Sequence, residues 1–411
     1  MNDGPTPRRP HIAASLNALA VVATLLTVGF FWARNAQERL LHTVAPEFSD
    51  AKLHGVALIR EAFSRPDTLV MFGSSELIPD VPMKAVEFFA DLPTGFSIFP
   101  VGKAGTTALS VLQKLGGAGE VLTGKKLVLS LSPSFFQSEN VDPKYFEGNS
   151  SKLQTKEFLW SDEFSPGLKT AAAKQILGYP KAYEGDWVLG FTLRRIAGGA
   201  WVDRALLALL EPYAYLDRAI SRMQDHAEAT AALLESPLPA GKARKTFLVG
   251  KSLNWDELFL SAERSSKELA RRSKARPLKV VRKAGEGDSL FVGKMKKAQE
   301  WRDFELVLRL LKEAGAYPLV MSMPIHADVM EAQGVSKAAW TEYGRELKAL
   351  AAKYDAPLIY FEDHERDANF FVDHADHIGS KGWWYYNKAM DDFFHNRSGS
   401  FPVASQAILL R

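Results

Sequence analysis

The stretch Leu69-Val70-Met71-Phe72-Gly73-Ser74-Ser75-Glu76-Leu77 (LVMFGSSEL) runs from an apolar segment into a glycine and two serines. It contains most of the first of five short apolar segments, at residues 68–72, 96–101, 126–131, 319–323 and 358–361. Runs of this length without polar alternation are typical of parallel strands buried on both faces. Helical patterns lie around them, at residues 81–91, 107–115, 300–313, 337–353 and 384–394. We therefore predict an α/β fold with an open, flavodoxin-like sheet of about five parallel strands.

The third and fourth predicted strands are much further apart than an ordinary crossover requires, which indicates an insertion. Residues of about 145–295 contain segments with apolar residues three and four apart, which favours helices. We expect a helical cap over the carboxyl edge of the sheet, where open α/β folds bind ligands. Within it, the basic stretch 274–301 has two interpretations: a solvated surface, or a site for an anionic polymer or lipid headgroups.

The N-terminal segment 12–32 carries no charged residue and is long enough to cross a bilayer core of about 30 Å. A cleaved signal peptide is the alternative, but the apolar run is too long and no clear A-x-A site follows. We predict a cytoplasmic tail at 1–11, a transmembrane anchor at 12–33, a helix-rich connector at 34–66 and an extracytoplasmic domain at 67–411. This places the chain in the cytoplasmic membrane, with a single span and the domain on the periplasmic or cell-wall side.

Composition excludes several kinds of chemistry. The chain has no cysteine, so thiolate nucleophiles, disulfides and cysteine-based zinc sites are impossible. The net charge of +3 over 411 residues is too small to suggest nucleic acid as a partner. Apolar residues at 46% and charged residues at 24% are ordinary globular values.

The turn after the first strand has a functional and a structural interpretation. In an open α/β sheet this turn can present a nucleophilic serine at the crevice. The G-x-S-x-G elbow does not fit, because Leu77 stands where its last glycine should be. Alternatively, Ser74 or Ser75 caps a helix whose positive end Glu76 favours.

A serine nucleophile needs a base, and the segment FFVDHADHIGSKGWWYY near the C-terminus supplies one. Asp373, His374, Asp376 and His377 crowd this turn. They suit either a metal site or a pair in which a carboxylate orients an imidazole, and we favour the pair, with no metal. Asp373 is the favoured partner of His377, because residues four apart on a helical turn can face each other whereas the adjacent Asp376 seldom can.

These features resemble the SGNH (GDSL-type) hydrolase superfamily, and more closely the membrane-anchored DltD family. The resemblance lies in the N-terminal span, in FGSSEL, and in DHIGSKGWW, which is similar to the D-x-x-H-L-G-x-K-G-W ending of that family. It implies Ser75 as the nucleophile, with Ser74 in place of the family aspartate, and His377 as the catalytic histidine. The usual aspartate three residues before the histidine is replaced by His374.

The oxyanion site is also implied by the resemblance. Gly105 matches the second-block glycine whose backbone N–H serves the oxyanion, with Gly102 as the competing choice. The third-block asparagine is absent, and Ser132 to Ser134 occupy its place, with a serine-proline pair as in DltD proteins. Two further features have structural alternatives: His326 either lines the crevice or is incidental, and the aromatic run 383–386 either stacks on a sugar or packs its helix on the sheet.

The function that the resemblance implies is a serine acyltransferase or esterase that needs no cofactor and acts on an envelope polymer. Family membership would imply transfer of D-alanyl groups to teichoic acid, an anionic polymer. The implied partners are a membrane-bound O-acyltransferase and an acyl carrier protein pathway. The alternative is a non-catalytic membrane scaffold that binds the polymer or the acyltransferase through a degenerate domain.

Overall fold

The computed structural model describes residues 10–45, 49–235, 252–272, 278–374 and 377–397. Five parallel strands form one sheet in the order β2-β1-β3-β4-β5. Their bounds are β1 Thr68–Phe72, β2 Ser97–Val101, β3 Lys126–Leu131, β4 Tyr317–Ser322 and β5 Leu358–Tyr360. This order is the flavodoxin-like arrangement, so the predicted α/β class with five parallel strands is confirmed.

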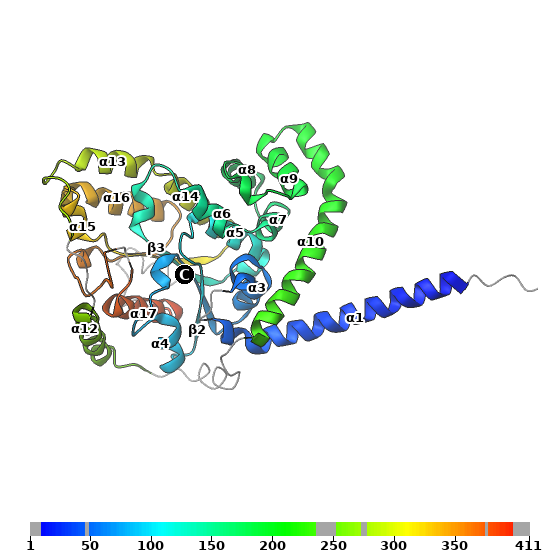
Figure 1. Ribbon diagram of the computed structural model, residues 1–411, viewed down its shortest axis with the longest axis horizontal. Helices are drawn as coiled ribbons and strands as arrows, with labels where there is room; N and C mark the ends of the chain where they lie inside the picture. Colours follow the sequence, from blue (N-terminus) through cyan, green and yellow to red (C-terminus); the bar gives the residue numbers. More distant parts are fainter. Residues whose placement is uncertain (1–9, 46–48, 236–251, 273–277, 375–376, 398–411) are drawn as a thin grey trace, which may run out of the picture.

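Helices cover both faces of the sheet, as Figure 1 shows. One face carries α4 (Ala85–Asp91) and α17 (Ser380–Phe394), which contact each other. The other carries α3 (Ala57–Ser64), α5 (Ala108–Ala118), α14 (Gln299–Glu313) and α16 (Lys337–Lys353). β1 is buried along its whole length because it lies inside the sheet and between both layers.

Most of the remaining helices lie between β3 and β4, as the sequence predicts. They are α6 Pro143–Asn149, α7 Lys152–Leu159, α8 Pro166–Ile176, α9 Trp187–Gly198, α10 Trp201–Glu235, α12 Trp255–Arg272 and α13 Asp288–Lys297. The short helix α15 (Ala327–Ala332), after β4, has no counterpart among the predicted elements. In the aromatic run, Trp383 and Tyr386 are buried in the core, so packing of α17 on the sheet is the correct interpretation.

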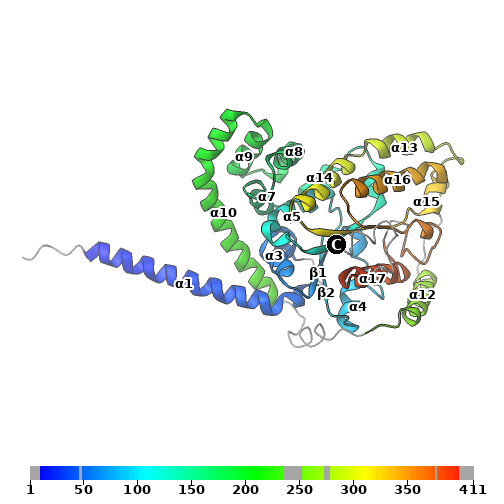
Figure 2. The ribbon, with the colours of Figure 1, turned by 180° about the vertical axis from the view of Figure 1, so that it is seen from behind.

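The N-terminal helix α1 (Pro10–Leu40) extends away from the rest of the molecule (Figure 1). It is long and apolar enough to cross a membrane. Its C-terminal half meets the domain, next to α3 and the C-terminal end of α10, and the view from behind in Figure 2 shows the same junction. The short helix α2 (Asp50–His54) follows in the chain.

Candidate active site

The serine turn follows β1 at the carboxyl edge of the sheet. Ser75 begins a single turn of 3-10 helix, Ser75–Leu77, and its side chain is half-buried. Ser74 is buried, and its hydroxyl lies 3.4 Å from the Lys103 carbonyl oxygen. The backbone of Ser74 is not in the extended conformation usual for a helix cap, and its hydroxyl accepts no hydrogen bond from this turn. The helix-cap interpretation is therefore wrong for Ser74.

Backbone contact with the turn after β2 fixes the serine turn. The Gly73 N–H donates to the Val101 carbonyl at 3.2 Å. Gly102 has φ +148°, and a Cβ there would lie 1.9 Å from the Gly73 oxygen. Gly105 also has positive φ, +79°, and a Cβ would lie 2.6 Å from the Tyr145 ring. Both glycines considered for the oxyanion site are therefore required by the backbone geometry.

Glu76 differs from the sequence-based expectation of a residue at a helix end. Its side chain is fully buried, and Oε1 accepts a hydrogen bond from the Ser74 N–H at 2.8 Å. Burial raises the pKa of Glu76, while that hydrogen bond and the charge of His377 act in the opposite direction. The charge of Glu76 in turn adds to the effect of burial in raising the pKa of Tyr386 on α17. Glu76 thus lies between the serine turn and the C-terminal helix.

The Asp373–His377 pair stands on a loop before α17. An antiparallel bridge between Phe371 and Ile378 closes the base of this loop, and the Val372 N–H donates to the His377 carbonyl at 3.0 Å. At the tip, 2.7 Å separates His377 Nδ1 from Asp373 Oδ2. The predicted contact therefore exists, although Asp373, His374 and His377 are not assigned to a helix. Asp376 lies outside the described residues.

The motif that follows the histidine has a structural explanation. A Cβ at Gly379 would lie 2.7 Å from the Phe371 oxygen, and one at Gly382 would lie 2.5 Å from the Phe370 oxygen. These two glycines allow the loop backbone to pass directly over the start of α17. Lys381 forms an ion pair with Asp367 at 2.7 Å, which fixes the preceding segment to the same helix.

His326, which follows β4, joins this loop to the sheet edge. It is buried, stacks on the Phe371 ring with centroids 4.5 Å apart, and has Nε2 3.4 Å from His374 Nδ1. Burial, and secondarily the charge of His374, lower the pKa of His326. Within the described parts of the chain, no group of three or more His, Asp or Glu side chains is arranged to hold a metal ion.

The place of the missing third-block asparagine is taken by hydroxyl groups. Ser132 is buried and Ser134 exposed, with 2.7 Å between their hydroxyl oxygens. Asn149, on α6, is a buried amide that sequence reasoning missed. Its Nδ2 donates to the Tyr145 carbonyl at 2.8 Å, and its Oδ1 is 3.1 Å from the Thr106 hydroxyl. That amide stabilises the loop after β2 and is not directed at the serine.

A cavity of about 30 Å³ borders Gly73, Ser74 and Ser132, which is room for about one water molecule and not for a substrate. Glu300 lines it from α14, with Oε1 accepting from the Ala108 N–H at 2.6 Å. Burial and the nearby Asp303 raise the pKa of Glu300 to about 8. No sequence signal indicated Glu300, because only the fold brings it next to residues so distant in the chain.

Comparisons with known proteins identify the family of this chain. The sequence model of the family described as "DltD protein" matches residues 45–395, most of the chain. The chain belongs to the DltD family. It is 28% identical to Protein DltD of Bacillus subtilis (strain 168) over 390 residues, covering 92% of this chain and 93% of that protein. Protein DltD of Staphylococcus aureus (strain NCTC 8325 / PS 47) is 20% identical over 399 residues, covering 92% and 94% respectively. The match to the family model, at residues 45–395, begins after α1 and includes both the serine turn and the Asp373–His377 loop.

Proposed function

We propose that this DltD-family protein is a membrane-anchored serine acyltransferase or esterase that transfers D-alanyl or another small acyl group to or from a cell-envelope polymer. Membership of the family supports a role in the D-alanylation of teichoic acid. In this proposal residues 1–11 are cytoplasmic, 12–33 cross the membrane, and the domain at 67–411 works outside it. The apolar α1 supports the membrane span in this topology.

The observation that carries the proposal is the 2.7 Å contact between His377 Nδ1 and Asp373 Oδ2. An ionised carboxylate only accepts hydrogen bonds, so Nδ1 holds the proton and Nε2 of the neutral ring is left as the base. His377 is also close enough to influence the pKa of Glu76, the residue next to Ser75. This influence supports the proposal that base and nucleophile belong to one site.

In the reaction, His377 Nε2 takes the proton of the Ser75 hydroxyl as Ser75 Oγ attacks the acyl carbonyl carbon. The bond from that carbon to the donor oxygen or sulfur breaks, and the leaving group receives the proton from His377. An acceptor hydroxyl of the polymer, or water, then gives its proton to His377 as its oxygen attacks the acyl carbon of the acyl-serine. The bond from that carbon to Ser75 Oγ breaks, and Ser75 Oγ takes the proton back from His377. Because the Ser74 N–H is bound to Glu76, we assign oxyanion stabilisation to other backbone donors, with Gly105 among them.

The partners follow from the same proposal. A membrane-bound O-acyltransferase and an acyl carrier protein pathway would supply the acyl group, and the anionic polymer would accept it. The donor reaches this protein already activated as an ester or thioester, so the chemistry assigned to Ser75, His377 and Asp373 requires no cofactor.

The test is labelling of the full-length protein in detergent with a fluorescent fluorophosphonate, which reacts with activated serines. We expect wild type and Ser74→Ala to label and Ser75→Ala not to label. Ser289→Ala is the control, since it removes an exposed serine hydroxyl on α13, outside the proposed site. Labelling of Ser75→Ala at the wild-type rate would disprove the nucleophile. No labelling of any form would favour the non-catalytic scaffold.

A further inference from the structure

Helix α10 lies on the side of the molecule from which α1 emerges, and both views show this (Figures 1 and 2). The two helices are held together at one end of each. Gln37 on α1 donates to the His226 carbonyl at 3.1 Å and to the Thr230 hydroxyl at 3.2 Å. The Phe30 ring contacts His226 with centroids 5.2 Å apart. The position of α1 relative to α10 is thus fixed by specific contacts.

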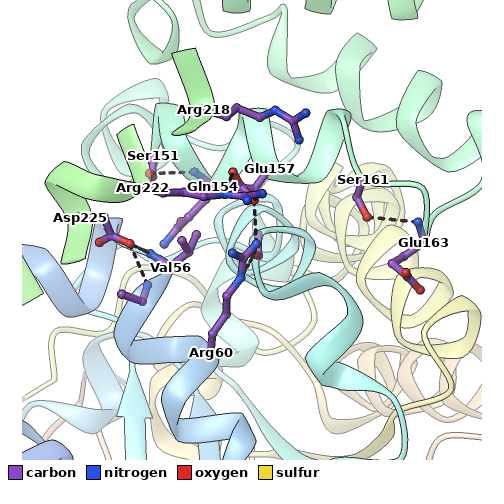
Figure 3. A network of polar contacts seen from close by, with 12 residues as sticks. Val56, Arg60, Ser151, Gln154, Glu157, Ser161, Glu163, Arg218, Arg222 and Asp225 are labelled. Carbon is purple, nitrogen blue, oxygen red and sulfur yellow. Dashed lines mark hydrogen bonds and ion pairs between the residues drawn. The ribbon is translucent and has the colours of Figure 1, made fainter. Parts of the chain in front are cut away.

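The face of α10 that packs on the domain is charged. Asp217 pairs with Lys156 at 2.6 Å, and Arg222 binds Glu157, with Nε and Oε1 2.7 Å apart. Asp225 accepts from the Val56 N–H at 2.9 Å. Figure 3 shows Arg222 and Arg60 meeting at Glu157, and Asp225 directed at Val56. Ion pairs and hydrogen bonds, more than apolar burial, attach this part of α10 to the molecule.

The opposite face of α10 is apolar and open to solvent. We call it the outer stripe, and its members are exposed side chains four and three residues apart: Val202, Leu206, Leu209, Tyr213, Leu216, Ile220 and Met223. Leu209 is 80% exposed. At 100° per residue these positions share one side of the helix. A surface helix in water normally turns its apolar side inward, so α10 is inverted with respect to the domain.

The outer stripe is continuous with the contact made by the anchor. At its C-terminal end Met223, together with Leu234, lines a groove of about 420 Å³ whose other wall is α1, including Leu25 and Phe30. Beyond its contact with α1, the outer stripe is not covered by any of the described residues. The apolar surface of α10 therefore begins beside the helix that crosses the bilayer and faces the same side of the molecule.

The aromatic residues of this region favour lipid headgroups as the environment. Trp187 on α9 is 62% exposed, and its ring lies 5.5 Å from that of Tyr213. Trp201 and Tyr215 are exposed on α10 as well. Tryptophan and tyrosine are enriched at membrane–water interfaces because one end of each ring is apolar and the other polar.

From these observations we infer that the outer stripe of α10 lies on the surface of the same lipid bilayer that α1 crosses. The inference rests on the membrane anchor of the proposed function. α10 then acts as a second, interfacial contact, and it holds the sheet and its carboxyl edge in a fixed orientation above the membrane.

The absence of cysteine makes a direct test possible, because any introduced cysteine is unique. The full-length variants Leu209→Cys and Leu216→Cys are labelled with a nitroxide and placed in vesicles of phosphatidylcholine and phosphatidylglycerol. Paramagnetic collision with oxygen, which partitions into lipid, is compared with collision with a water-soluble nickel chelate. Val21→Cys on α1 is the lipid control. Ala352→Cys, exposed on α16 on the side away from α1, is the water control.

We expect the probes at 209 and 216 to favour oxygen several-fold over the water control, approaching the probe at 21. If they behave like the probe at 352 while the probe at 21 is in lipid, the inference is wrong, whereas the membrane anchor of the proposed function is supported. If the probe at 21 is also in water, the anchor fails and the inference with it. If, in native membranes, the α10 probes are shielded from both reagents, a protein partner covers the stripe and the bilayer is the wrong occupant.

Discussion

The serine turn is enclosed by the sheet, whereas the Asp373–His377 pair stands at the tip of a loop. Gly73, Ser74 and Glu76 are buried, and backbone contact with Gly102 determines where they lie. Asp373, by contrast, has a side chain that is 45% exposed, and its contact with His377 is at the tip of the loop. A substitution in the serine turn is therefore expected mainly to lower the stability of the fold. A substitution in the Asp373–His377 pair is expected mainly to lower the rate of the reaction.

Gly102→Ala tests most directly whether backbone contact with Gly102 holds the serine turn in place. The new Cβ would overlap the Gly73 oxygen at a φ of +148°, so we expect a loss of about 3–5 kcal/mol and little folded protein. Gly119→Ala is the control, because Gly119 has positive φ, +67°, but nothing within 4 Å. Yield and melting temperature of the two variants give the answer. Equal stability of the two would show that the contact of the two turns is not what fixes the serine.

On the histidine side, Asp373→Asn should leave stability within about 0.5 kcal/mol of wild type because the side chain is half-exposed. The rate of fluorophosphonate labelling should fall roughly 10²- to 10⁴-fold, since an amide no longer holds the imidazole in the required tautomer. Asp376→Asn is the matched control and should label almost normally. The reverse result, with Asp376→Asn slow and Asp373→Asn fast, would assign the orienting role to the other aspartate.

A pH dependence of stability, spread over several pH units, is expected on the serine side. The pKa of Glu300 is raised from 4.5 to about 8, so between these values the folded state holds a proton that the unfolded state lacks. The contribution of Glu300 to the free energy of unfolding is then fully present below about pH 4.5. It is lost as the pH rises to about 8, by at most about 1.4 kcal/mol per pH unit.

Glu300→Gln should flatten this slope while its amide oxygen still accepts from Ala108. Melting temperatures between pH 5 and pH 8 measure the difference, with Glu87→Gln, exposed on α4, as the control. A wild-type slope that survives in Glu300→Gln would show that Glu300 is ionised in the fold throughout this range.

Prediction from sequence succeeded where local pattern determines structure. The runs 68–72 and 126–131 are strands with the predicted bounds, because their apolar residues are buried on both sides. β4 begins two residues before its predicted start, since Tyr317 is exposed and Pro318 half-buried at the sheet margin, where no apolar pattern marks a strand. The local spacing also correctly predicted the contact between Asp373 and His377, although neither residue is assigned to a helix.

The buried polar groups could not be predicted in this way. Glu76 is an acidic residue in a turn, and such residues are usually solvated, yet the fold encloses it. Asn149 and Glu300 reach the loop after β2 from helices that lie far along the chain. Their roles depend on long-range packing, which one sequence does not specify residue by residue.

The adjacency of β3 and β4 also affects the order in which the protein folds. β1, β2 and β3 lie within residues 68–131, but β4, which pairs with the other edge of β3, begins about 185 residues later. At a synthesis rate of about 5–20 residues per second, that delay is roughly 10–40 s. Throughout it, Val128 and Leu129 form an open strand edge that another chain could pair with. We therefore expect the nascent chain to depend on a holding chaperone until Tyr317 has emerged.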